Sequence, residues 1–172
     1  MTPTLVKGSL LATATLASLA APALAATTAQ VSGQGALSTD PRRNFSVSAK
    51  LNADGTASGR ATLINKAFTG ENCKQPYMLQ VDISCAKVLD DKTVIFGGST
   101  KRTNDPSLVD AVYFSVQDNG EPGANSDKIS RAYFFDDDPN TTGSPALCQG
   151  STLADLPLET IVSGNIQVKV SQ

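Results

Sequence analysis

The segment with the richest side-chain chemistry runs from Asp118 to Asp127 and reads DNGEPGANSD. Ca²⁺ takes roughly six to eight oxygen ligands, often from flexible loops of this composition. Asp118, Asn119, Glu121 and Asp127 are therefore candidate metal ligands, and Ca²⁺ is the cofactor that they would hold. The spacing is not that of an EF-hand, and Asp and Asn side chains also bond their own backbone in turns. We favour a structural turn over a metal site.

A second acidic cluster, Asp136–Asp138, follows an apolar stretch that ends at Phe135. Paired carboxylates hydrolyse glycosidic bonds when they face each other at a set separation. Consecutive residues of a strand point in alternating directions, so these three carboxylates converge only if the chain turns. The sequence does not place Asp136 beside Glu121 or Asp82, and a solvated loop is the favoured interpretation.

The chain contains no histidine, which excludes whole classes of chemistry. Serine and cysteine hydrolases that use an imidazole base are excluded. Zinc sites built on histidine are excluded too, and three cysteines cannot form a four-thiolate site. Tryptophan is also absent, which weakens the case for an aromatic platform that stacks on sugars. We assign no catalytic residue, and the composition leans away from an enzyme.

The three cysteines, Cys73, Cys85 and Cys148, predict one disulfide and one remaining thiol in an exported chain. Cys85 lies in an apolar strand, and Cys148 follows a loop rich in Gly, Pro, Ser and Thr. Joining these two would tie a late segment to the sheet and stabilise the fold by roughly 3–5 kcal/mol. The pairings Cys73–Cys148 and Cys73–Cys85 are the alternatives.

Two sequons, at Asn44 and Asn140, would accept N-glycans in a eukaryotic secretory pathway. Asn140 lies in an expected loop and is the better acceptor. A bacterial host would leave both side chains bare.

The first 25 residues resemble an export signal. Lys7 provides the positive charge, Leu10–Leu24 is a short uncharged run, and the small residues up to Ala25 form a cleavage pattern. The run is too short and too rich in Ala and Thr for a membrane span. We therefore expect a signal peptide at 1–25 and a single secreted, extracellular domain at 26–172.

Charge limits the partners that this domain is expected to have. Removal of Lys7 leaves 13 basic and 16 acidic residues. Without a basic stripe, we expect no nucleic acid as a partner. No second apolar stretch is long enough to span a bilayer. A cell-wall or other extracellular ligand is the partner class that remains.

Apolar and polar residues alternate along most of the chain after the signal, which predicts strands. The clearest hairpin joins Phe45–Leu51 to Ala57–Ile64 through a turn at Asp54 and Gly55. Gln30–Leu37 is a candidate edge partner for the last strand, Ile161–Val170. No stretch has a convincing helical period, although Leu153–Leu158 allows one short turn.

Two further strand pairs are expected in the middle of the chain. In the first, Leu79, Val81, Ile83 and Cys85 share one face, and the return strand carries Gly97 and Gly98, which predict a bulge or a close backbone approach. In the second, Val112–Val116 pairs with a strand from Ile129 to Phe135. About eight strands of this kind predict an all-β fold, either an antiparallel sandwich or a small, partly closed barrel.

The sequence VQDNGEPG at Val116–Gly123, followed by DKIS at Asp127–Ser130, resembles a signature of small secreted bacterial β domains called post-COAP-1 domains. Val81–Cys85 is similar to the mid-chain cysteine strand of that family, and Ser163–Val168 is similar to its closing strand. The resemblance covers nearly all of the domain.

This resemblance implies an exported single-domain β fold and a bridge between Cys85 and Cys148. It brings no catalytic residues and no assigned activity. Cys73 departs from the family pattern.

Three hypotheses for function follow. The leading one is a non-enzymatic extracellular module that binds a ligand or associates with a surface. The second is a carboxylate-dependent extracellular hydrolase that would use Asp118, Glu121, Asp127 and Asp136. The third is a structural or inhibitory secreted protein that acts through an edge strand or an apolar patch.

Overall fold

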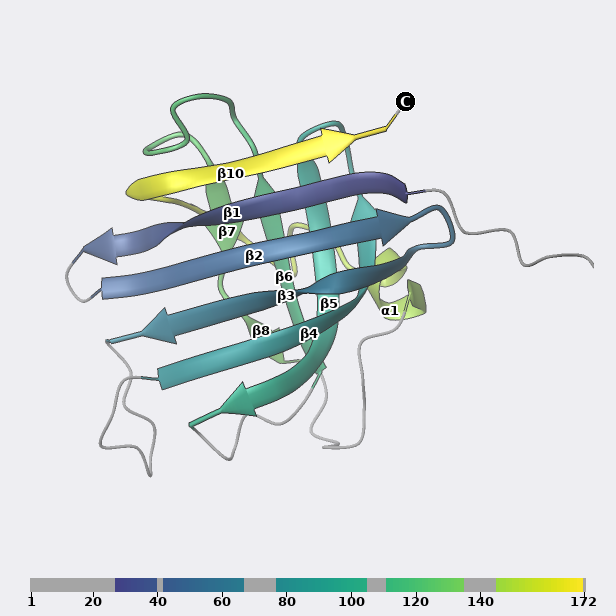
Figure 1. Cartoon of the computed structure of the whole chain (residues 1–172), viewed down its shortest axis with the longest axis horizontal. Coiled ribbons are helices and arrows are strands. Elements are labelled where there is room, and N and C mark those ends of the chain that lie inside the picture. Colours follow the sequence, from purple (N-terminus) through teal and green to yellow (C-terminus); the bar gives the residue numbers. More distant parts are fainter. Residues whose placement is uncertain (1–26, 40–41, 67–76, 105–110, 135–144, 172) are drawn as a thin grey trace, which may run out of the picture.

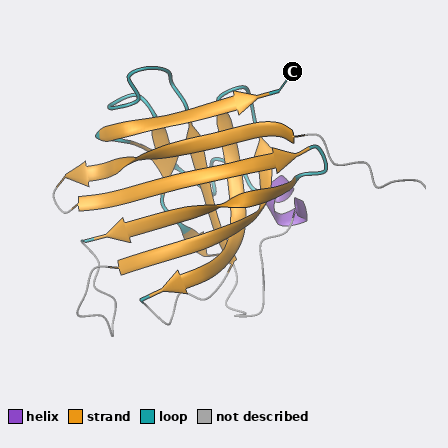
Figure 2. Cartoon of the chain, in the orientation of Figure 1, coloured by secondary structure: helices purple, strands orange, loops and turns teal. Residues whose placement is uncertain are grey.

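The computed structural model describes residues 27–39, 42–66, 77–104, 111–134 and 145–171. These residues form ten strands and one short helix, drawn in Figure 1 and Figure 2. The elements are β1 (Thr27–Thr39), β2 (Arg42–Asn52), β3 (Thr56–Asn65), β4 (Tyr77–Val88), β5 (Thr93–Thr103), β6 (Ala111–Gln117), β7 (Lys128–Ser130), β8 (Tyr133–Phe134), α1 (Pro145–Gly150), β9 (Leu158–Thr160) and β10 (Ser163–Val170).

All ten strands belong to one antiparallel sheet that curls on itself. Nine follow the order β10-β1-β2-β3-β4-β5-β6-β7-β9, and β8 pairs with β6. In Figure 1, β10, β1, β2, β3 and β4 form a front layer, and β6 and β7 run crosswise behind it. The strand β5 bends from the rear round to the lower edge of the front layer. This half-closed barrel confirms the predicted all-β fold.

The apolar core lies between the two layers. Along β2, the inward residues Phe45, Val47, Ala49 and Leu51 are each 4–5% exposed, which confirms the predicted alternation. The inner hollow lined by Phe45 and its neighbours measures only about 30 Å³. Among the described residues around this hollow, side chains leave little of the space in which larger barrels hold ligands.

Cys85 corrects one sequence prediction, because it does not share the face of Leu79, Val81 and Ile83. The register between β4 and β5 shifts between Ile83 and Cys85, and the extra residue of this bulge reverses the direction of the side chains that follow. Cys85 belongs to a second apolar cluster, separate from the main core. A Cβ on Gly97 would come within 2.8 Å of the Cys85 sulfur, so the predicted close approach is confirmed.

The second cluster lies under α1, a helix that the sequence analysis did not expect. A disulfide joins Cys85 to Cys148, with a Cα–Cα distance of 6.1 Å, as predicted. The Lys87 ammonium donates hydrogen bonds to the carbonyls of Gln149 (2.7 Å) and Ser151 (3.2 Å) at the end of this helix. Cys73 lies outside the described residues.

The strand predicted from Ile129 to Phe135 is two short strands instead. β7 pairs with the end of β6, β8 pairs with its start, and Phe135 lies outside the described residues. Between the two pairings, the Ser115 amide donates to the Ser130 hydroxyl at 2.9 Å. A side chain therefore satisfies a backbone donor that a continuous strand would have paired.

The end of the chain pairs as the sequence predicts, with one difference in the bounds. β10 pairs with β1 from Ser163 to Val170. The predicted start at Ile161 is two residues too early, and Leu158–Thr160 before it forms a separate short strand, β9, which pairs with β7. The turn expected near Leu153 is present, because the amides of Asp155 and Leu156 both donate to the Thr152 carbonyl.

Candidate functional site

The loop from Asp118 to Asp127, called here the clasp loop, lies along the free edge of β10. One side of β10 pairs with β1. On the other side, the Ile166 amide donates to the Asp127 carboxylate at 2.7 Å, and the Val168 amide donates to the Asp118 carboxylate at 2.9 Å. Two carboxylates thus occupy the place of a neighbouring strand and satisfy the amides of an exposed edge.

Asp127 is fully buried, with an exposed fraction of 0%. Its second carboxylate oxygen accepts the Asn119 amide at 2.8 Å, so both oxygens are occupied by backbone donors. Its own backbone amide donates to the Gly123 carbonyl at 2.8 Å, and its carbonyl accepts the Ile161 amide at 2.9 Å. A Cβ on Gly123 would overlap the Asp127 carboxylate, which explains why glycine is required there.

The side chains of the other two candidate metal ligands are also held by hydrogen bonds, Glu121 as an acceptor and Asn119 as a donor. Glu121 is exposed and accepts the side-chain amides of Asn165 (2.7 Å) and Gln167 (3.2 Å). The Asn119 side chain donates to the Ser126 carbonyl at 2.7 Å. Among the described residues, no group of three or more His, Cys, Asp or Glu side chains is arranged to hold a metal ion. The Ca²⁺ site stays a prediction, and the clasp loop provides no further support for it.

A second contact closes the half-barrel on another side. The Glu159 carboxylate on β9 accepts a hydrogen bond from the Arg43 guanidinium of β2 at 2.8 Å. It also forms an ion pair with Arg131. The Arg43 side chain is only 18% exposed and also donates to the Ser38 hydroxyl. The hydrogen bond from Arg43 lowers the pKa of Glu159 against the opposing effect of its partial burial. Arg43 therefore joins β2 to β9 through a half-buried ion pair.

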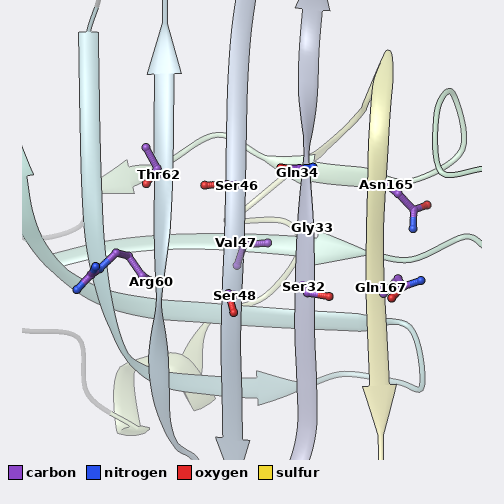
Figure 3. Close-up of a pocket in the computed structure, with 10 residues that line it drawn as sticks. All are labelled: Ser32, Gly33, Gln34, Ser46, Val47, Ser48, Arg60, Thr62, Asn165 and Gln167. Carbon is purple, nitrogen blue, oxygen red and sulfur yellow. The ribbon is translucent and has the colours of Figure 1, made fainter.

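The outward side of the front layer, called here the outer face, is polar throughout its centre. Two rows of side chains cross the strands in register (Figure 3). These rows are Asn165-Gln34-Ser46-Thr62 and Gln167-Ser32-Ser48-Arg60. The rows arise because every second residue of each strand turns away from the core.

A shallow hollow of about 610 Å³ lies over these rows. Its lining consists of Gly33, Val47 and the polar residues of the two rows. A second hollow of about 130 Å³ shares Ser32, Ser48 and Gln167 with the first and reaches Lys50 and Lys169. The two hollows therefore form one continuous polar trough across β10, β1, β2 and β3.

The amino-acid pattern does not reveal this trough, because serine, threonine and glutamine in alternation indicate only the solvated side of a strand. The signal that would have found it is the register, which stacks the polar residues of four strands into rows.

The remaining candidate residues of the sequence are the two sequon asparagines and the second acidic cluster. Asn44 is half-buried on β2, and its side-chain oxygen accepts the Arg42 guanidinium at 2.8 Å. Asn140 and Asp136–Asp138 lie outside the described residues.

Comparison of the chain with protein-family models, curated proteins and solved structures gives no match. Within the described part of the chain, no helix has the length and apolar character needed to cross a membrane.

Proposed function

We propose that this chain is an exported, non-enzymatic binding module whose outer face holds an extended polar ligand of a cell wall or extracellular matrix. The observation that carries the proposal is the continuous trough of about 610 Å³ and 130 Å³ on one face of the sheet. Its hydroxyl, amide and cationic groups can bond a polar ligand without rearrangement of the strands that carry them. Ligand sites are concave in this way and are usually preformed.

Export is part of the same proposal and rests on the sequence. Residues 1–25 resemble a signal peptide. The disulfide between Cys85 and Cys148 suits an oxidising compartment, where such bonds persist. The resemblance to post-COAP-1 domains supports the same placement outside the cell.

The hydrolase hypothesis has less support. It needs carboxylates that are free to donate a proton or attack a substrate. Both oxygens of Asp127 and both oxygens of Asp118 accept backbone amides. Carboxylates held in this way stabilise the fold, and their oxygens are already occupied by hydrogen bonds that a substrate would have to displace.

The structural or inhibitory hypothesis also has less support from the described residues. The free edge of β10 is bonded to the clasp loop, so two of its amides cannot recruit a foreign strand. Within the described residues, the exposed large hydrophobic side chains are Leu89 and Val162, which do not line the trough. Two separated side chains do not form the contiguous apolar patch of an interface.

The test measures binding of residues 26–172 to a panel of immobilised wall and matrix polysaccharides. Ser48→Tyr places a bulky ring in the trough, and Thr160→Tyr replaces another hydroxyl side chain by the same ring at an exposed position of β9, away from the trough. We expect binding to at least one polymer, a loss of about tenfold or more for Ser48→Tyr, equivalent to about 1.4 kcal/mol, and no loss for Thr160→Tyr. Absence of binding to every polymer, or binding insensitive to Ser48→Tyr, would overturn the proposal.

A further inference from the structure

We infer that the ligand of the outer face is an anionic polysaccharide, with carboxylates that bind near Lys50, Lys169 and Arg60. This inference rests on the proposed function and adds the charge of the ligand. It follows from how charge is distributed over the outer face, which differs from the distribution over the whole chain. The full chain has a formal net charge of −2.

Lys50 and Lys169 lie on either side of Gln30, one on β2 and one on β10. Since neighbouring strands lie about 4.8 Å apart, the two backbones that carry these lysines are about 10 Å apart. Both lysines are exposed, and no ion pair with an acidic side chain of the described residues involves either of them. Two like charges at this separation repel each other, and an anion bound between them would relieve that repulsion.

Arg60 extends the positive charge across the trough. Its side chain is 66% exposed and lies 3.5 Å from Asp82, which is also 3.2 Å from Lys101. The single carboxylate of Asp82 is therefore shared by two cations. The terminal nitrogens of the Arg60 guanidinium can still donate hydrogen bonds at the wall of the trough. Arg102 lies on β5, beyond β4, where it is in register with Gln80. A planar guanidinium is well suited to bind a carboxylate.

The shape and chemistry of the trough favour a polysaccharide over other polyanions. A peptide cannot join β1, β2 or β3 as an extra strand, because each already pairs on both sides. Single-stranded nucleic acid needs aromatic rings on which its bases stack, and no aromatic residue lines the trough. The same lack of aromatic rings removes the platform on which neutral sugars stack. Hydroxyl groups, amides and cations instead suit a sugar polymer that carries carboxylates.

The experiment uses polygalacturonate, its fully methyl-esterified neutral form and single-stranded DNA as probes of residues 26–172. The double variant Lys50→Gln/Lys169→Gln is compared with Lys66→Gln/Lys92→Gln, which removes two exposed lysines elsewhere. We expect polygalacturonate to bind and the first variant to bind at least about tenfold more weakly, while the control variant stays within about twofold. Affinity for polygalacturonate should also fall between about 50 mM and 200 mM salt, because ions screen exposed charges.

The outcomes separate this inference from the proposed function. If the neutral ester binds as well as polygalacturonate and Ser48→Tyr weakens both, the module binds polysaccharide but the inference about charge is wrong. Equal sensitivity of polygalacturonate binding to the two double variants would also overturn it, and so would tighter binding of DNA than of polygalacturonate. If no polysaccharide binds, both the inference and the proposed function are wrong.

Discussion

The clasp loop and the outer face lie on either side of β10 and use polar side chains in opposite ways. In the clasp loop, the carboxylates of Asp118 and Asp127 point at backbone amides of β10. On the outer face, the side chains of Asn165 and Gln167 on the same strand line the trough. The clasp carboxylates of Asp118 and Asp127 complete the fold. On the outer face, Glu121 of the clasp loop already accepts the side-chain amides of Asn165 and Gln167, and the hydroxyl and cationic groups of the other strands remain available to a ligand.

This difference shows that the density of reactive groups in a sequence does not by itself locate a site. A half-closed sheet has a free edge with unpaired amides, and each buried unpaired amide is costly. Carboxylates satisfy such amides strongly, because charged acceptors form the stronger hydrogen bonds. Closure of the sheet therefore accounts for the acidic residues Asp118 and Asp127 of the clasp loop.

The largest effect is expected where the clasp is most buried. Asp127→Ala removes two charge-assisted hydrogen bonds and leaves the Asn119 and Ile166 amides without an acceptor. We expect the free energy of unfolding to fall by about 3–4 kcal/mol, measured by urea denaturation. The exposed Glu121→Gln serves as a control in the same loop, with an expected change below about 0.5 kcal/mol. A loss below about 1 kcal/mol for Asp127→Ala would contradict the closing role of this residue.

Asp118 is expected to contribute less, because it is only half-buried. Asp118→Ala frees the amides of Val168 and Gly120, which water can reach more readily than the amides around Asp127. We expect a loss of about 1–2 kcal/mol in the same urea experiment. Hydrogen exchange at the Val168 amide should accelerate in this variant. Unchanged protection of that amide would show that the clasp does not hold β10 at this point.

The sequence predicted the sheet better than it predicted the site. Period-two alternation is set by burial of one face, so the hairpin of β2 with β3 and the pairing of β1 with β10 were both predicted. The bulge beside Cys85 was suggested only by Gly97 and Gly98 on the opposite strand, and its effect on the cysteine could not be read from alternation. Closure of the barrel brings Asp127 to Ile166 across a long sequence separation. Nothing local in the sequence encodes such a contact.

The outer face was missed for a related physical reason. A serine or glutamine on one strand has no distinguishing chemistry, and its meaning appears only when the register aligns it with others. Arg43 and Glu159 illustrate the same limit, since their pairing joins β2 to β9. The sequence identifies what each strand exposes, and the curl of the sheet decides what those residues meet.

The contact of Glu159 with Arg43 should make the closure sensitive to acid. The hydrogen bond from Arg43 is the chief cause that lowers the folded-state pKa of Glu159 below its ordinary value of 4.5. Its contribution to stability is therefore complete above about pH 4.5 and is lost as the pH falls through the lower folded-state pKa. Glu159→Gln should cost about 1 kcal/mol at neutral pH, and the difference from wild type should shrink in acid. A difference independent of pH would contradict an ionic contribution.

The smallest effect on stability is expected from the outer face, and this would complete the contrast with the clasp loop. Lys50 and Lys169 make no ion pair within the described residues, so Lys50→Gln/Lys169→Gln removes repulsion and no stabilising contact. We expect the free energy of unfolding to stay within about 0.5 kcal/mol of wild type, measured by urea denaturation without ligand. A loss above about 1 kcal/mol would assign these lysines to the fold. Retained stability together with lost binding would show that the two sides of β10 have separate roles.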